Sequence, residues 1–201
     1  VLTTAKHELG HVLGLGHDDE PQDVMSSRPE DRIPLYERRV DIWETVRAGG
    51  DRTGEGNSLY TEAIELFNEG EYEAARPVFT DAREVFADAV DQFGAARTAV
   101  GSFEGDPAAE TPDIERIRSL LGTLAERIGL LEAAADEMVD AAEAAAAGEG
   151  ETANDRRAAA NEQVEVFQQG GPVQLRDIAL GLGLVRGSDR EEPIAGPDGD
   201  Q

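Results

Sequence analysis

The chain opens with a short apolar pattern, which is followed by a stretch without periodicity up to residue 35. Leu2, Leu9, Val12 and Leu13 recur at spacings typical of one helix face, which predicts a helix over residues 1–13 that ends at Gly14. Residues 18–35 are rich in Asp and Pro, so a loop is expected there. The next apolar positions predict a second helix over residues 35–48, which should stop at Gly49-Gly50.

A stretch rich in Gly, Asp, Asn and Ser follows and is the best candidate for a domain boundary. We expect a linker over residues 50–58, between an N-terminal region (residues 1–49) and a helical region (residues 59–187). The helical region should begin with a hairpin over residues 59–100, with its turn at residues 68–71.

The remaining helices are predicted from apolar spacing and from breaks. An apolar stripe that starts at Ile114 predicts one long helix that continues through the alanine-rich stretch to Ala147, after a break at residues 101–112. Gly148 to Gly150 interrupts it, a polar helix should end at Gln169, and a short helix should cover residues 173–182. The acidic tail at residues 188–201 is expected to be disordered. The fold class predicted for the chain is mainly α.

Part of the hairpin resembles one tetratricopeptide repeat. The resemblance rests on a set of small and aromatic positions: Ala63, Leu66, Gly70, Tyr72, Ala75, Phe79 and Ala82. No second copy follows at the expected period, and Pro77 falls inside the second helix. An ordinary amphipathic helix pair explains the same pattern.

Charge changes the picture of the surface. The 201 residues include 43 Asp and Glu against 18 Lys and Arg, for a formal net charge of −25. Such a surface repels nucleic acids and anionic membranes. Lys6 is the only lysine, and this acidic, alanine-rich composition resembles that of proteins from salt-loving archaea. An acidic protein without salt adaptation is the alternative.

Two further absences limit the chemistry. The chain has no cysteine, which excludes disulfides, thiolate metal sites and cysteine nucleophiles. No apolar run reaches the roughly 18–20 residues that a membrane span needs, and the first residues show no signal-peptide pattern.

Three histidines, the only ones in the chain, fall within eleven residues near the start. On a helix His7 and His11 share a face and can bind one metal ion, while Glu8 projects beside them. Gly14 can adopt the positive φ that lets the chain turn sharply, so that His17 can supply a third nitrogen. Three nitrogen ligands leave a fourth position open, which is the arrangement of a catalytic zinc site.

The His7-Glu8-x-x-His11-x-x-Gly14-x-x-His17 sequence resembles the signature of the metzincin metalloproteases, and most of all their matrixin branch. The resemblance implies that Met25 forms the methionine turn beneath the metal. It also implies that residues 1–49 are the C-terminal part of an α+β catalytic domain, with residues 35–48 as the closing helix. Asp18 after the third histidine is similar to the adamalysin branch, and Ser26-Ser27 replaces the Tyr-Pro frequent in matrixins.

The resemblance implies a zinc-dependent endopeptidase that acts on peptides or proteins and is secreted or exposed at the cell surface. One Zn²⁺ would be held by His7, His11 and His17, with Glu8 as general base and then general acid. Family members also bind calcium, and Asp18, Asp19 and Asp23 offer oxygens, but their spacing matches no calcium loop. The family's substrate-binding sheet lies upstream of the zinc helix, so we expect the chain to begin inside that domain and to be inactive alone.

Two other functions remain open for the helical region. It could be a protein-interaction module with a non-catalytic protease remnant in front of it, although every ligand and the glutamate are present. It could instead be a spacer, which the alanine-rich stretch supports. Its many carboxylates, such as Glu132, Asp136 and Glu137, are expected to form a solvated face.

Overall fold

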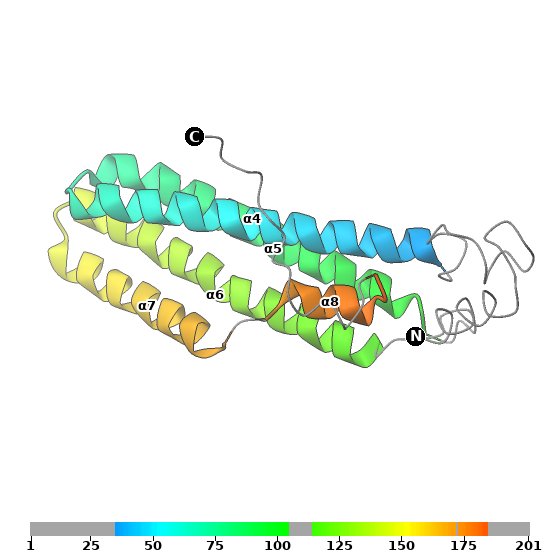
Figure 1. Cartoon of the computed structure of the whole chain (residues 1–201). Helices are drawn as coiled ribbons and strands as arrows, with labels where there is room; N and C mark the ends of the chain where they lie inside the picture. Colours follow the sequence, from blue (N-terminus) through cyan, green and yellow to red (C-terminus); the bar gives the residue numbers. More distant parts are fainter. Residues whose placement is uncertain (1–34, 105–113, 172, 185–201) are drawn as a thin grey trace, which may run out of the picture.

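A computed structural model describes residues 35–104, 114–171 and 173–184. These residues form five helices and no strand, which confirms the mainly α prediction for this part of the chain (Figure 1). The helices are α4 (Tyr36–Asn68), α5 (Tyr72–Gly101), α6 (Ile114–Ala146), α7 (Gly150–Gln169) and α8 (Leu175–Gly181). The predicted tail at residues 188–201 lies outside the described residues.

The four long helices follow one another as antiparallel neighbours. α4 packs on α5, α5 on α6, and α6 on α7, whereas α4 and α6 have few contacts with each other. The helices lie side by side in an elongated array, and the short α8 lies near the end at which α4 begins (Figure 1). α4 and α6 each hold 33 residues, which corresponds to a length of about 50 Å at the usual rise per residue.

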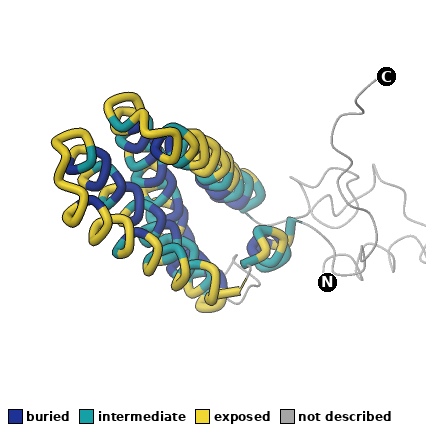
Figure 2. Tube along the Cα trace, turned by 90° about the vertical axis from the view of Figure 1, so that its left-hand side faces the viewer, coloured by how far each residue is buried: buried dark blue, intermediate teal, exposed yellow. Residues whose placement is uncertain are grey.

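The buried positions of α5 repeat every seven residues. Alanines at 75, 82, 89 and 96 alternate with Phe79, Phe86, Phe93 and Val100, and all eight are at most 1% exposed. Intervals of three and four residues keep one narrow stripe facing the neighbours, as in coiled coils. Because α5 packs against both α4 and α6, its buried phenylalanines lie in the core between these helices. Buried positions line the inner sides of the array and exposed positions its outer sides (Figure 2).

The predicted turn at residues 68–71 and the predicted interruption at Gly148 to Gly150 are both confirmed. α4 ends at Asn68 and α5 starts at Tyr72, with Gly70 at φ 84°; α6 ends at Ala146 and α7 starts at Gly150, with Gly148 at φ 79°. In each turn a glycine at positive φ ends the helix, and the same type of hydrogen bond follows it. The Glu71 N–H donates to the Leu66 carbonyl in the first turn, and the Glu149 N–H donates to the Ala144 carbonyl in the second, both at 2.9 Å.

The predicted linker over residues 50–58 is wrong. α4 runs without a break from Tyr36 to Asn68, so the expected stop at Gly49-Gly50 is wrong as well. Residues 36–48 are therefore the first turns of the hairpin's first arm. The arms of this hairpin hold 33 and 30 residues, each nearly as long as a whole tetratricopeptide repeat of about 34 residues.

Two of the glycines that led to the wrong prediction of a break lie in close contact with α5. A Cβ added to Gly49 would lie 2.9 Å from Cε1 of Phe93, and one added to Gly56 would lie 2.6 Å from Cε1 of Phe86. The two glycines are seven residues apart on α4 and their phenylalanines are seven apart on α5. The glycines thus let the large rings of α5 approach the backbone of α4, and packing outweighs the low helix propensity of glycine.

Candidate functional site

All residues of the predicted zinc site lie outside the described part of the chain. This applies to the three histidines, the glutamate, the turn glycine and the methionine: His7, Glu8, His11, Gly14, His17 and Met25. The described residues begin at Leu35. Its φ of 57° is unusual for a residue other than glycine, and its carbonyl accepts the Arg39 N–H at 3.0 Å. The zinc site therefore remains a prediction from sequence.

The described residues contain no alternative metal site. The chain has no cysteine and its three histidines all precede Leu35, so only carboxylates remain as ligands in the helices. Among the described residues no three His, Cys, Asp or Glu side chains come together in a way that could hold a metal ion. No helix in the described part of the chain is both long enough and apolar enough to cross a membrane.

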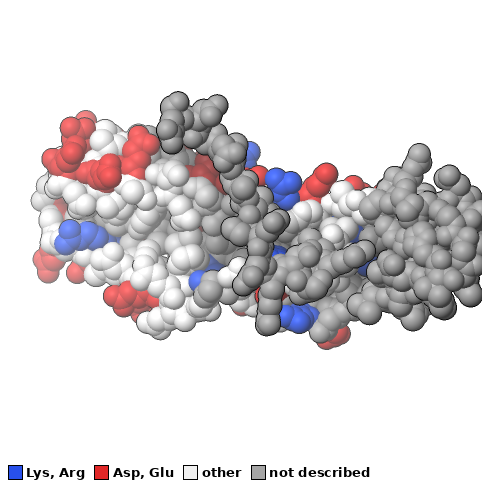
Figure 3. All heavy atoms as spheres, viewed as in Figure 1, with Lys and Arg blue, Asp and Glu red and all other residues white. Residues whose placement is uncertain are grey.

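The carboxylates lie on the surface and several are paired with arginine. Arg76 and Arg83 on α5 contact Glu143 and Asp136 on α6, with N–O distances of 3.4 and 2.9 Å. Arg156 on α7 reaches Glu137 of α6 at 3.0 Å and Asp140 at 3.4 Å. On the face shown in Figure 3, acidic groups outnumber basic ones over the end that holds the α4–α5 turn. Exposed pairs of this kind stabilise a fold only slightly.

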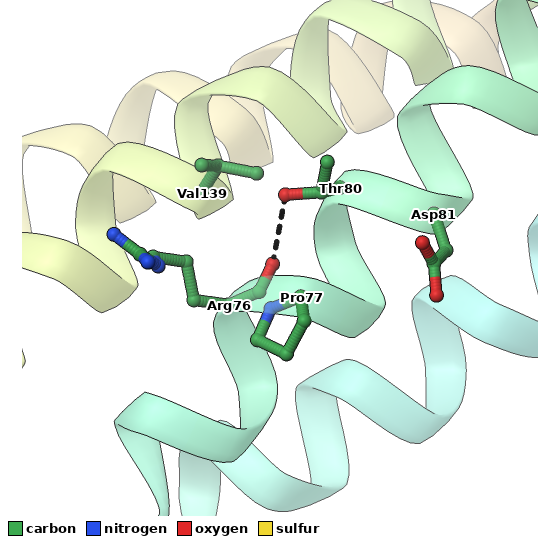
Figure 4. A pocket seen from close by; sticks show the side chains of 5 residues that line it. All are labelled: Arg76, Pro77, Thr80, Asp81 and Val139. Atoms are coloured by element: carbon green, nitrogen blue, oxygen red, sulfur yellow. Dashed lines mark hydrogen bonds between the residues drawn. The ribbon is translucent and has the colours of Figure 1, made fainter.

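Two hollows on the surface are open to solvent and lack a reactive constellation. One, of about 340 Å³, is lined by Arg76, Pro77, Thr80, Asp81 and Val139. There the Thr80 hydroxyl donates to the Arg76 carbonyl at 3.1 Å, while Asp81 points away from Val139 (Figure 4). The other, of about 410 Å³, is lined by Arg97, Glu115, Arg118 and Ser119. In it Arg118 is already paired with Glu104 at 2.5 Å.

Among the residues that the structure describes, one cation is buried, at the end of the array where α4 begins. Arg39 on α4 is 2% exposed, and its Nη1 donates to the Leu182 carbonyl at the end of α8 at 2.9 Å. Its guanidinium also lies 5.8 Å from the centre of the Phe103 ring. Burial lowers the pKa of Arg39 from its ordinary value. Sequence reasoning missed this residue, although it lies one turn before Ile42 on the buried stripe of α4.

Tyr60 is a second titratable group whose pKa is shifted by burial. It lies on the α5 side of α4, and its ring centre is 5.5 Å from that of Phe79 in an edge-to-face arrangement. Burial disfavours the phenolate and raises the pKa of Tyr60 to about 12. The hydroxyl therefore stays protonated at physiological pH, and Tyr60 acts as part of the core.

Comparison with known proteins adds no assignment. No protein-family model, no curated protein and no solved structure matches this chain.

Proposed function

We propose that the chain contributes the catalytic zinc site of a metalloendopeptidase. The observation that supports this proposal is the spacing of His7, Glu8, His11, Gly14 and His17 within eleven consecutive residues. Three imidazoles at these positions suit Zn²⁺, which favours nitrogen ligands and keeps one coordination position open in catalytic sites. Met25 follows eight residues after His17, at a distance that suits the methionine turn of the resembled family.

Each residue has a defined task in this reaction. His7, His11 and His17 would hold the ion, which would lower the pKa of a water to about 7 and polarise the scissile carbonyl. Glu8 would take a proton from the attacking water and pass it to the leaving amine. Gly14 would allow the turn that lets His17 join the other two histidines. The reaction class is hydrolysis of a peptide bond in a peptide or protein substrate.

For the helical array we propose a supporting role. Two of its helices are 33 residues long, and cross-helix arginine–carboxylate pairs line its surface. Among the described residues, Val166 at 47% is the one large apolar side chain that is exposed. A protein-docking surface is usually marked by a contiguous apolar patch, which a single valine does not provide. A rigid spacer or scaffold fits these observations better than an interaction module does.

Zinc content tests the ligand set without requiring any substrate. We expect the 201-residue chain, titrated with Zn²⁺ in high salt, to bind one zinc ion weakly. His11→Ala and His17→Ala should each weaken this binding further, because each removes one of three ligands. Zinc affinity of either variant equal to that of the unchanged chain would rule out this ligand set.

Hydrolysis of a peptide substrate tests the role of Glu8, and it is measured on the full-length protein. Glu8→Gln should keep the zinc and lose on the order of 10²- to 10⁴-fold in kcat, the contribution of a general base. Glu20→Gln, outside the motif, is the matched control and should leave both zinc and kcat unchanged. Full activity of Glu8→Gln, or activity that survives a chelator, would contradict the mechanism.

A further inference from the structure

The short helix α8 is held at one end of the array by closely fitted apolar contacts. Ile178 and Leu182 are fully buried in the core cluster that includes Ile42 of α4 and Ile117 of α6. Gly181 lies so close to Ile117 that an added Cβ would be 2.6 Å from Cγ1 of that isoleucine. α8 therefore fits the space between α4 and α6, two helices that otherwise have few contacts.

A buried guanidinium completes this fit. Arg39 donates to the carbonyl of Leu182, the residue that caps α8, and a cation at this end of a helix is favoured by the helix dipole. Gly183 follows at φ 73°, and a Cβ there would lie 3.3 Å from Nη1 of Arg39. The end of α8 is thus shaped around the Arg39 side chain.

α8 depends on these contacts for its structure. Its seven residues are far fewer than the roughly 12–15 that an isolated helix needs in water. It is joined to α7 through Gly170 and Gly171, the latter at φ 66°. The phenylalanines at the centre of the core, in contrast, lie on α5, which contacts α4 and α6 over most of its length and has no appreciable contact with α8.

We propose that α8 is a latch: it undocks from α4 and α6 as a unit while the core around α5 stays folded, and Arg39 holds it closed. Local opening of this kind is expected where an element makes few contacts compared with the rest of the fold. Undocking uncovers Ile42 of α4 and Ile117 of α6. It also breaks the hydrogen bond between Arg39 and the Leu182 carbonyl, which favours reclosure.

Hydrogen exchange measured by mass spectrometry on the whole chain tests the latch. Amides of residues 175–184 should exchange faster than those of residues 79–96 in the unchanged chain. Arg39→Met keeps the length of the side chain and removes the donor, so exchange in residues 175–184 should accelerate about tenfold or more, as for loss of a hydrogen bond from a charged group. Exchange in residues 79–96 should not change.

Trp43 gives a second readout, since it is the only tryptophan and packs against the same core cluster. Its emission should shift to longer wavelength in Arg39→Met and further in Ile178→Asp, which places a charge in the buried face of α8. Arg47→Met is the matched control, because Arg47 lies on the same helix and is exposed. It should leave both the emission and the exchange rates unchanged.

Three results would overturn the latch. The first is exchange of residues 175–184 at the rate of residues 79–96 in the unchanged chain. The second is an effect of Arg39→Met on residues 175–184 no larger than that of Arg47→Met. The third is loss of protection over residues 79–96 in both Arg39→Met and Ile178→Asp, since α8 would then be an inseparable part of the core.

Discussion

At the residue scale, the glycines of α4 show how the same residue type can mark opposite environments. Gly54 has nothing within 4 Å of the place where a Cβ would be, whereas Gly56 lies against the ring of Phe86. Both residues occupy the same helix two positions apart, so they face different sides of it. Gly54 is tolerated and Gly56 is required by the packing of α4 against α5.

Alanine substitutions at these two positions should therefore have opposite effects. Gly54→Ala should raise the free energy of unfolding by about 0.5–1 kcal/mol, because alanine favours the helix and fills open space. Gly56→Ala gains the same propensity but forces the Phe86 ring to move, and overpacking a core costs about 1–3 kcal/mol. Urea unfolding followed by circular dichroism should place the midpoint of Gly56→Ala below that of Gly54→Ala. The reverse order would show that the two helices do not pack closely at Gly56.

At the element scale, α7 has the weakest attachment of the long helices. It contacts α6 almost exclusively, and only Ala153 and Ala160 among its residues are buried. Its last turn is held by Arg127 of α6, which donates to the carbonyls of Phe167, at 2.8 Å, and Gly171. The same guanidinium lies 4.8 Å from the centre of the Phe167 ring. A single side chain of α6 thus binds the end of α7 in two ways.

Arg127→Met should loosen the end of α7 without unfolding the array. The substitution removes both hydrogen bonds to the terminal carbonyls, so amide exchange over residues 160–170 should accelerate roughly tenfold or more, the effect of losing hydrogen bonds to a charged group. Arg156→Met, which removes exposed ion pairs at the other end of α7, should accelerate exchange by less than about fivefold. Equal effects of the two variants would show that Arg127 does not cap α7.

Most helices were predictable from sequence, through apolar stripes and glycine breaks, but the continuity of α4 was not. The stripe from Ile114 gave α6 to within one residue, and Gly70 gave the turn between α4 and α5. The middle of α4 was misread because its core positions are Gly49, Gly56 and Ala63, which show no apolar stripe until the phenylalanines opposite them are known. The zinc site could be predicted without knowledge of neighbouring helices, because its signature lies within one short stretch of sequence. It lies outside the described residues and stays a prediction.

At the scale of the whole molecule, charge is the dominant surface property. A net charge of −25 on 201 residues produces repulsion that favours the expanded chain, while the ion pairs across α5 and α6 offset only part of it. At 1 M salt the screening length falls to about 3 Å, from about 10 Å at 0.1 M. Repulsion between acidic groups on neighbouring helices is then largely screened.

The thermal midpoint should consequently rise with salt. We expect an increase of roughly 4–8 °C in Tm between 0.1 and 1 M KCl, which corresponds to about 2 kcal/mol for a chain of this size. Sucrose at matched osmolality is the control for effects unrelated to charge and should produce a smaller increase. A Tm that falls with KCl would show that the ion pairs contribute more to stability than the repulsion subtracts.

The seven-residue repeat shared by neighbouring helices also limits how the array can change in length. Removing one residue from α5 would turn every later phenylalanine by about 100° around the helix, away from the glycines of α4. Removing seven would keep the stripe on its face, but only if α4 and α6 were shortened by the same two turns. Insertions and deletions compatible with this fold therefore come in matched sets across three helices, and its length can vary only in discrete steps.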